Sequence, residues 1–118
     1  RLPDGAFQAR MASASAVVSA SGHEAFGMAV ADALTAGIPT VASFIPAHRE
    51  LAAMVPPGAA LWLVNPDDEV ALADTLRVAA GTDRAEHRRN PLPTWSDVML
   101  ATREIYASVA PVHGAVSR

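Results

Sequence analysis

Two carboxylates and a glycine stand close together in a stretch of small residues that runs from Ser19 to Pro39. Glu24 and Asp32 are eight positions apart, and Gly27 lies between them, where a predicted loop leads into a predicted helix. A helix start presents unpaired backbone N–H groups and a partial positive charge. Gly27 and its neighbours could therefore hold a phosphate or sugar oxygen, with the two acids bounding the pocket. A simpler interpretation of Glu24, as an N-terminal cap of the helix, stays open.

Other kinds of reactive site find little support. The chain has no cysteine, which excludes disulfides, thiolate metal sites and cysteine nucleophiles and is compatible with a reducing compartment. The four histidines are too dispersed for a metal site and are expected to be solvated or capping residues; they are His23, His48, His87 and His113. Ser19 and Ser21 near His23 lack the Gly-x-Ser-x-Gly elbow of a hydrolase. Trp62 and Trp95 are interpreted as core or docking residues.

The elements around the two acids predict a βαβ unit. Gly5 to Ser15 favours a short helix, and residues 16–19 favour a buried strand. A loop then feeds a helix that begins after Gly27 and stops at Gly37, and residues 38–42 have the β-branched content of a second buried strand. Such units place parallel strands side by side and bind ligands outside the carboxyl ends of the strands.

The rest of the chain extends this pattern. Residues 48–54 predict a short helix stopped by prolines, and residues 60–64 predict a third strand. Asn65 to Asp68 supplies a turn and an N-cap for a helix that ends near Gly81, and residues 82–93 read as an exposed connection. We therefore expect an α/β, Rossmann-like three-layer fragment: a short parallel sheet of about three strands flanked by helices. A C-terminal amphipathic helix over 95–109 is expected to dock on this domain.

Composition sets the remaining limits. With 118 residues and a net charge of −3, the chain is expected to form one small domain. All nine basic residues are Arg and form no basic stripe, which argues against nucleic acid as a partner. No apolar run approaches the roughly 20 residues of a membrane span, and no signal peptide is recognisable, so we expect a soluble, cytoplasmic protein. The chain begins without Met, inside an apparent loop, which suggests a truncated segment.

The stretch from Ser21 to Ala42 resembles a family signature. The family pattern begins with Ser, any two residues, Glu, a small residue, Phe and Gly. A second Glu follows, with seven residues between the two acids, and Gly-x-Pro-Val comes after it. Glu24, Asp32, Gly37 and Pro39 occupy the matching positions. This is similar to retaining glycosyltransferases of GT-B fold, the group 1 glycosyl transferases that include bacterial glycogen synthases, sucrose synthases and mannosyltransferases. Weaker similarity covers nearly the whole chain.

The resemblance implies a role for each matching position. Glu24 would hydrogen-bond hydroxyls of the donor sugar, and the backbone amides of Phe26, Gly27 and Met28 would hold the sugar and the distal phosphate. Asp32 would accept hydrogen bonds from the ribose hydroxyls. The family usually has Glu there, and Asp is one methylene shorter, which leaves the ribose contact and the donor preference open.

The resemblance also implies an organisation for the whole protein. Residues 1–110 would be the C-terminal part of the donor-binding Rossmann-like domain, and residues 111–118 a tail. The chain would be the donor-binding part of a glycosyltransferase that transfers a sugar from a nucleoside diphosphate to an acceptor hydroxyl, with retention at the anomeric carbon and without a cofactor or metal. The Arg and Lys that the family places on the diphosphate, and an N-terminal acceptor domain, would precede Arg1. No catalytic set is then complete in this chain, and we expect it to be inactive alone.

Two further interpretations remain. One is a sugar-nucleotide epimerase of the same fold. The other is a non-catalytic module that binds a partner or forms a homo-oligomer through its exposed sheet edge, because an unpaired edge of a parallel sheet makes self-association reasonable. Titration with a nucleotide sugar separates the binding functions from the assembly module.

Overall fold

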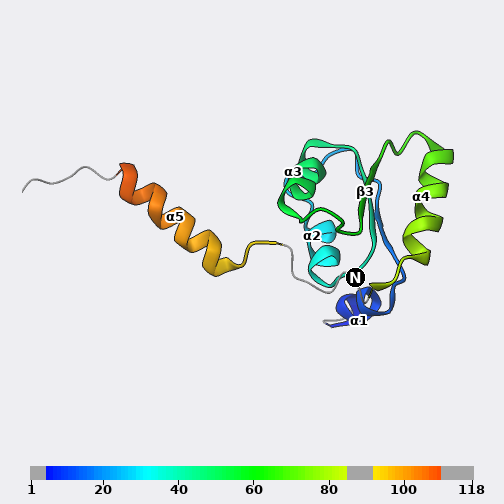
Figure 1. Cartoon of the computed structure of the whole chain (residues 1–118), viewed down its shortest axis with the longest axis horizontal. Coiled ribbons are helices and arrows are strands. Elements are labelled where there is room, and N and C mark those ends of the chain that lie inside the picture. Colours follow the sequence, from blue (N-terminus) through cyan, green and yellow to red (C-terminus); the bar gives the residue numbers. More distant parts are fainter. Residues whose placement is uncertain (1–4, 85–91, 110–118) are drawn as a thin grey trace, which may run out of the picture.

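A computed structural model describes residues 5–84 and 92–109, and gives the backbone alone for Gln8. Helices and strands alternate along the first part of the chain, and one long helix follows near its end (Figure 1). In order, they are α1 (Ala6–Ser13), β1 (Val17–Ser19), α2 (Met28–Thr35), β2 (Thr40–Ser43), α3 (Pro46–Met54), β3 (Leu61–Val64), α4 (Glu69–Gly81) and α5 (Trp95–Val109). The predicted order of elements is confirmed, and α3 begins two residues earlier than expected because Pro46 suits the first turn of a helix.

The three strands form one parallel sheet in the order β1-β2-β3. In the middle strand, Val41 lies opposite Val18 on one side and Trp62 on the other. Helices α2 and α3 pack on one face of the sheet, and α4 packs against β2 and β3 on the other (Figure 1). The expected three-layer α/β architecture with a short parallel sheet is therefore confirmed.

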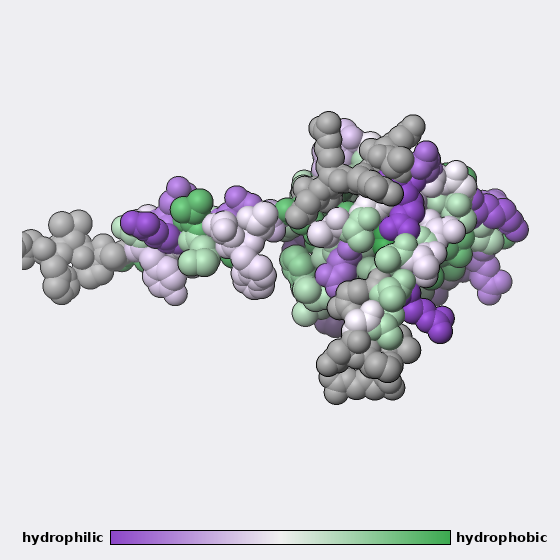
Figure 2. Space-filling view, turned by 90° about the horizontal axis from the view of Figure 1, so that it is seen from below, coloured by the Kyte–Doolittle hydropathy of each residue, from purple (hydrophilic) through white to green (hydrophobic). Residues whose placement is uncertain are grey.

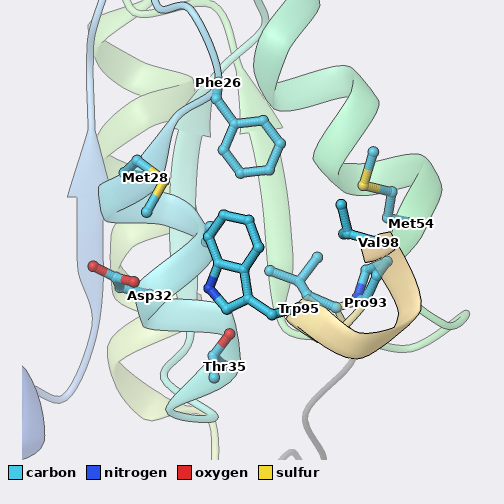
Figure 3. A pocket seen from close by; sticks show the side chains of 10 residues that line it. Phe26, Met28, Asp32, Thr35, Met54, Pro93, Trp95 and Val98 are labelled. Atoms are coloured by element: carbon cyan, nitrogen blue, oxygen red, sulfur yellow. The ribbon is translucent and has the colours of Figure 1, made fainter. Parts of the chain in front are cut away.

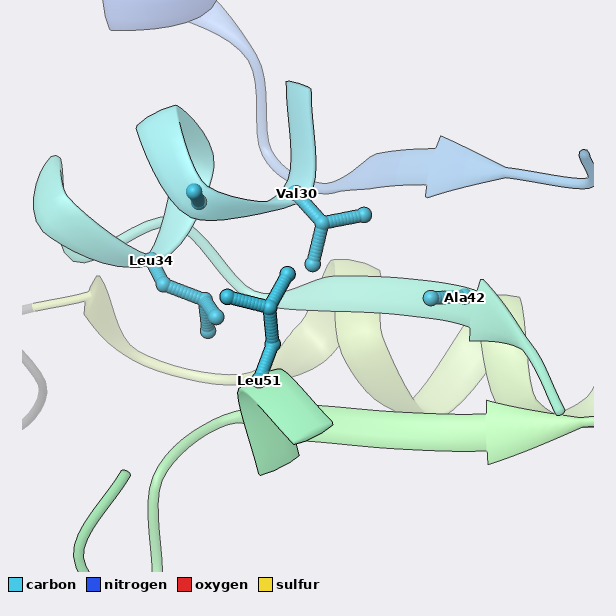
Figure 4. Packing of buried hydrophobic residues seen from close by; sticks show 5 residues of the cluster. Val30, Leu34, Ala42 and Leu51 are labelled. Atoms are coloured by element: carbon cyan, nitrogen blue, oxygen red, sulfur yellow. The ribbon is translucent and has the colours of Figure 1, made fainter. Parts of the chain in front are cut away.

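The core lies between the sheet and helices α2 and α3 (Figure 4). Five buried side chains form its centre: Val30, Ala31, Leu34, Ala42 and Leu51. Alanines at two of these positions let α2 approach the strand closely, so the core consists of many small contacts rather than a few aromatic ones. Burying a side chain such as Leu51 stabilises the fold by about 1.5–3 kcal/mol.

Strand β1 is less buried than the sequence predicted. Val18 is 51% exposed, and all three residues of β1 are at least partly accessible. Among the described residues, β1 pairs only with β2, and α4 covers β2 and β3. The apolar sequence of β1 resembled that of a central strand, but β1 lies at the edge of the sheet.

The last helix has the predicted bounds but does not dock as expected. No residue of α5 is buried, and Trp95 and Tyr106 are 85% and 69% exposed. Figures 1 and 2 show α5 extending away from the body of the protein. The amphipathic pattern indicated which face of α5 is apolar, but the α/β core is already covered by α2, α3 and α4. None of the described helices combines the length and apolar character needed to cross a membrane.

Candidate functional site

Gly27 lies where the loop after β1 becomes helix α2. It is the N-cap residue and adopts a left-handed conformation, with φ 86° and ψ 49°. A Cβ atom at this position would lie 3.0 Å from Cδ2 of His48 and 3.2 Å from Cδ1 of Leu51. Both the backbone conformation and the close packing against α3 therefore require glycine here.

The start of α2 carries no side-chain cap. Among the described residues, no side-chain oxygen accepts a hydrogen bond from the first turn, so the interpretation of Glu24 as an N-cap is wrong. The amide of Ala31 donates to the carbonyl of Gly27 at 3.0 Å and so begins the helical ladder. The amides before it have no acceptor within the helix, as at every helix start, and N–H groups of this kind can donate to an anion.

Glu24 is held by its own loop. The hydroxyl of Ser21 donates to Oε1 of Glu24 at 2.8 Å, and both residues are half-buried. The carbonyl of Ser21 in turn accepts a hydrogen bond from Oγ of Ser43, at the end of β2, at 2.5 Å. The loop is thus anchored across the carboxyl ends of two neighbouring parallel strands, which is where α/β folds bind ligands.

His48 lies beneath this loop. Its side chain is fully buried, so the expectation of a solvated or capping histidine is wrong at this position. Nδ1 of His48 lies 2.9 Å from the carbonyl oxygen of Ser43 and 3.2 Å from its hydroxyl. Nε2 has no hydrogen-bond partner among the described residues.

Asp32 lies on the exposed side of α2, where it borders a largely apolar pocket of about 600 Å³ (Figure 3). Phe26 and Met28 from the predicted site line the same pocket. Trp95 and Val98 of α5 close its other side. Trp95 is therefore neither a core residue nor a fully docked one, contrary to the prediction, but an exposed ring at the mouth of this pocket.

The structure thus divides the predicted site residues into two neighbouring groups. Phe26, Met28 and Asp32 share the apolar pocket, whereas Glu24 is not among its lining residues and belongs to the hydrogen-bonded loop. Gly27 lies between Phe26 and Met28 at the helix start.

Sequence reasoning missed the part that β2 and α3 play in the site. Ser43 and His48 follow the second predicted strand. The carboxyl ends of adjacent parallel strands lie at the same edge of a sheet. That rule could have identified Ser43 as a neighbour of the loop after β1. It does not indicate that the His48 ring turns inward.

Comparison of the sequence with models of known protein families identifies a matching family. The model of the family described as glycosyl transferases group 1 matches residues 3–80, which is 78 of the 118 residues. The match spans α1 to most of α4 and includes the whole loop and helix start. No curated protein matches the chain. Because the family model spans more than half of the sequence, this protein belongs to the glycosyl transferases group 1 family.

Proposed function

We propose that this chain provides part of the donor site of a retaining glycosyltransferase and binds a nucleoside diphosphate sugar. The observation that carries the proposal is the start of α2, where Gly27 adopts φ 86° and no described side chain caps the helix. The first amides of α2 have no described side-chain acceptor, so a phosphate oxygen can accept hydrogen bonds from them. The unpaired amides and the helix dipole favour its negative charge.

In this proposal, the two acids hold different parts of the donor. Glu24 is oriented by the hydroxyl of Ser21 and accepts hydrogen bonds from hydroxyls of the sugar. Asp32 borders the apolar pocket with Phe26 and Met28 and accepts hydrogen bonds from the ribose. Because Asp is one methylene shorter than the usual Glu of the family signature, a water molecule bridges its contact to the ribose.

The helix start also supports the chemistry. Transfer of the sugar breaks the bond between its anomeric carbon and the distal phosphate, and negative charge accumulates on the departing phosphate. The backbone amides of Phe26, Gly27 and Met28 stabilise that charge without a proton transfer, a metal or a cofactor. The sugar passes to an acceptor hydroxyl with retention of configuration, and the proton of that hydroxyl passes to an oxygen of the departing diphosphate. A separate acceptor domain presents the hydroxyl.

We expect the isolated chain to bind its donor weakly and to show no turnover. Three of the described arginines already have partners: Arg49 lies over the ring of Phe44 at 5.1 Å, Arg77 pairs with Asp74, and Arg84 donates to carbonyls of α1. The resemblance assigns the diphosphate to an Arg and a Lys, and no Arg is among the described residues that line the largely apolar pocket of about 600 Å³. Without cations on the diphosphate, charge-assisted hydrogen bonds are missing from the site.

Ligand-observed NMR with UDP-glucose, ADP-glucose, GDP-mannose and the three nucleoside diphosphates tests this function. We expect binding of one nucleotide series, and Glu24→Ala to lower the affinity for the nucleotide sugar about tenfold or more, as loss of hydrogen bonds to a charged group does. Glu69→Ala, an exposed acid in the first turn of α4, is the matched control and should leave binding unchanged. A folded wild-type chain that binds none of the six compounds would overturn the proposal. Conversion of one bound nucleotide sugar into its epimer would favour the epimerase.

A non-catalytic assembly module is the second candidate, and the exposed apolar stripe of α5 favours it. The stripe includes Trp95, Met99, Ile105 and Tyr106, all of them largely exposed. Contiguous apolar surface of this kind is typical of contact sites between proteins. Light scattering over a range of concentrations tests this function: a stable dimer that binds no nucleotide sugar would favour it over donor binding.

A further inference from the structure

The loop that carries Glu24 rests on a hydrogen-bonded chain that ends at a buried histidine. We propose that His48 is a positioning residue of the donor site, which acts through Ser43 and Ser21 to fix the carboxylate of Glu24. The inference rests on the proposed function, because it assigns to His48 the orientation of a group that holds the donor sugar. His48 itself does not touch the donor.

The first step is the protonation of the ring. Nδ1 of His48 lies 2.9 Å from the carbonyl oxygen of Ser43, and a carbonyl oxygen can only accept. Nδ1 therefore carries a proton and donates it. In the neutral ring, Nε2 then holds the lone pair, and it is buried beside Gly27 with no partner among the described residues.

The second step is the direction of the Ser43 hydroxyl. Its oxygen lies 3.2 Å from Nδ1 of His48, which already bears a proton, so the hydroxyl proton cannot point there. It points instead to the carbonyl of Ser21, 2.5 Å away. Because Nδ1 is protonated, the hydroxyl of Ser43 donates its hydrogen bond to the carbonyl of Ser21 in the loop.

The third step reaches the carboxylate. The backbone of Ser21 is fixed by Ser43, and the side chain of Ser21 donates to Oε1 of Glu24 at 2.8 Å. Three hydrogen-bonded links therefore join α3 to the acid that is proposed to hold the sugar. They cross from the end of β2 to the loop after β1, so they also set the distance between these two parts of the site.

Nε2 of His48 makes no hydrogen bond among the described residues, so Nδ1 is the nitrogen that links the ring to the loop. An unpaired buried acceptor costs stability, and native proteins leave few of them. Gly27 packs directly over this side of the ring, where a Cβ atom would lie 3.3 Å from Nε2. The ring therefore supports the helix start by packing and orients the loop by Nδ1.

Two amide substitutions separate the two nitrogens. In His48→Asn the amide nitrogen can take the place of Nδ1 and donate to Ser43, whereas in His48→Gln the amide lies nearer the place of Nε2. We measure dissociation constants by ligand-observed NMR for whichever of UDP-glucose, ADP-glucose and GDP-mannose binds, and for the matching nucleoside diphosphate. Ile38→Ala, at a buried residue that the proposed site does not use, controls for a general loss of stability. All binding is measured where circular dichroism shows each variant to be folded.

We expect His48→Gln to weaken binding of the nucleotide sugar roughly three- to tenfold, the effect of one hydrogen bond, and His48→Asn and Ile38→Ala to keep wild-type affinity. Affinity for the nucleoside diphosphate, which has no donor sugar for Glu24 to hold, should fall less than affinity for the nucleotide sugar, because only the packing of the ring against Gly27 affects it. In the Glu24→Ala background, His48→Gln should add no further loss, because both changes act on the same contact.

Several results would contradict the inference. Equal losses for nucleotide sugar and nucleoside diphosphate, or additive losses with Glu24→Ala, would show that His48 has only a structural role. Weaker binding in His48→Asn with normal binding in His48→Gln would instead assign a direct contact to Nε2. If the wild-type chain binds no donor, the proposed function fails as well; if it binds and His48→Gln is normal, only this inference fails.

Discussion

Gly27 connects the fold to the candidate site more directly than any charged residue does. Its positive φ ends the loop after β1, and its missing side chain lets α2 lie against His48 and Leu51. The first amides of α2, which follow Gly27, have no described side-chain acceptor and are proposed to bind the donor. A single substitution at this position should therefore change stability and binding together.

Gly27→Ala is expected to destabilise the protein more than Gly58→Ala. Both glycines have nearly the same φ, 86° and 87°, so both substitutions cost about 1–2 kcal/mol of backbone strain. Only at Gly27 would the new methyl also meet buried atoms, which adds about 1–3 kcal/mol of overpacking. Urea unfolding gives both values. Equal losses of unfolding free energy at the two positions would show that the side chains of His48 and Leu51 move aside without an energetic penalty.

Asp32→Glu should strengthen donor binding. The longer side chain reaches one methylene further from α2, toward the ribose that a water molecule bridges in the proposed site. Replacing the water with a direct hydrogen bond is expected to raise affinity for the nucleotide sugar about threefold, and Asp32→Asn should lower it. Competition NMR against the bound nucleotide sugar measures both. If Asp32→Asn binds as well as the wild type, Asp32 has no contact with the donor.

At the scale of elements, α5 begins with three reciprocal hydrogen bonds between Thr94 and Asp97. The hydroxyl and the amide of Thr94 donate to Oδ2 of Asp97 at 2.6 and 2.7 Å, and the amide of Asp97 donates to the hydroxyl of Thr94 at 3.3 Å. The hydrogen bond from the hydroxyl of Thr94, and to a smaller extent that from its amide, holds the pKa of Asp97 below its ordinary value of 3.8. The ionised carboxylate therefore stabilises the first turn of α5.

This pair predicts a pH dependence of α5. Because the pKa of Asp97 is lower in the folded helix, its contribution is fully present above the unfolded value of 3.8 and is lost as the pH falls through the folded value. The Cα chemical shifts of Ser96 and Val98 should move toward random coil between about pH 5 and about pH 2. In Asp97→Asn they should lie near those low values at every pH. A wild-type helix that keeps its shifts at about pH 2 would show that the cap does not depend on ionised Asp97.

The sequence predicted local features well and long-range ones poorly. The limits of α2 and α4 were predictable because Gly27, Gly37 and Asp68 are local signals for helix ends, and Asp68 does cap α4 by accepting from the amide of Ala71 at 2.9 Å. The burial of His48 was not predictable, because it depends on how α3 packs beneath the loop. The exposed position of α5 was not predictable for the same reason. An apolar stripe indicates that a helix contacts some partner, but it does not identify that partner.

Across the whole molecule, an isoleucine-to-alanine substitution should lower the free energy of unfolding strongly in the core and very little in α5. Ile38 is 1% exposed and Ile105 is 64% exposed. We expect Ile38→Ala to lower the free energy of unfolding by about 2–5 kcal/mol and Ile105→Ala to change it by less than about 0.5 kcal/mol. Urea unfolding at a concentration where the protein is monomeric measures both. A large loss in Ile105→Ala would mean that α5 packs on the body in solution.

At the scale of the whole molecule, the proposed donor site for a nucleotide sugar lies at the start of α2. Amide chemical shifts, followed by ¹⁵N NMR during titration with the nucleotide sugar that binds, test this placement most directly. We predict the largest changes at Phe26, Gly27 and Met28, smaller ones at Glu24, and none along α4 on the opposite face of the sheet. Changes confined to α5, or spread evenly over the protein, would contradict the assignment of the donor site.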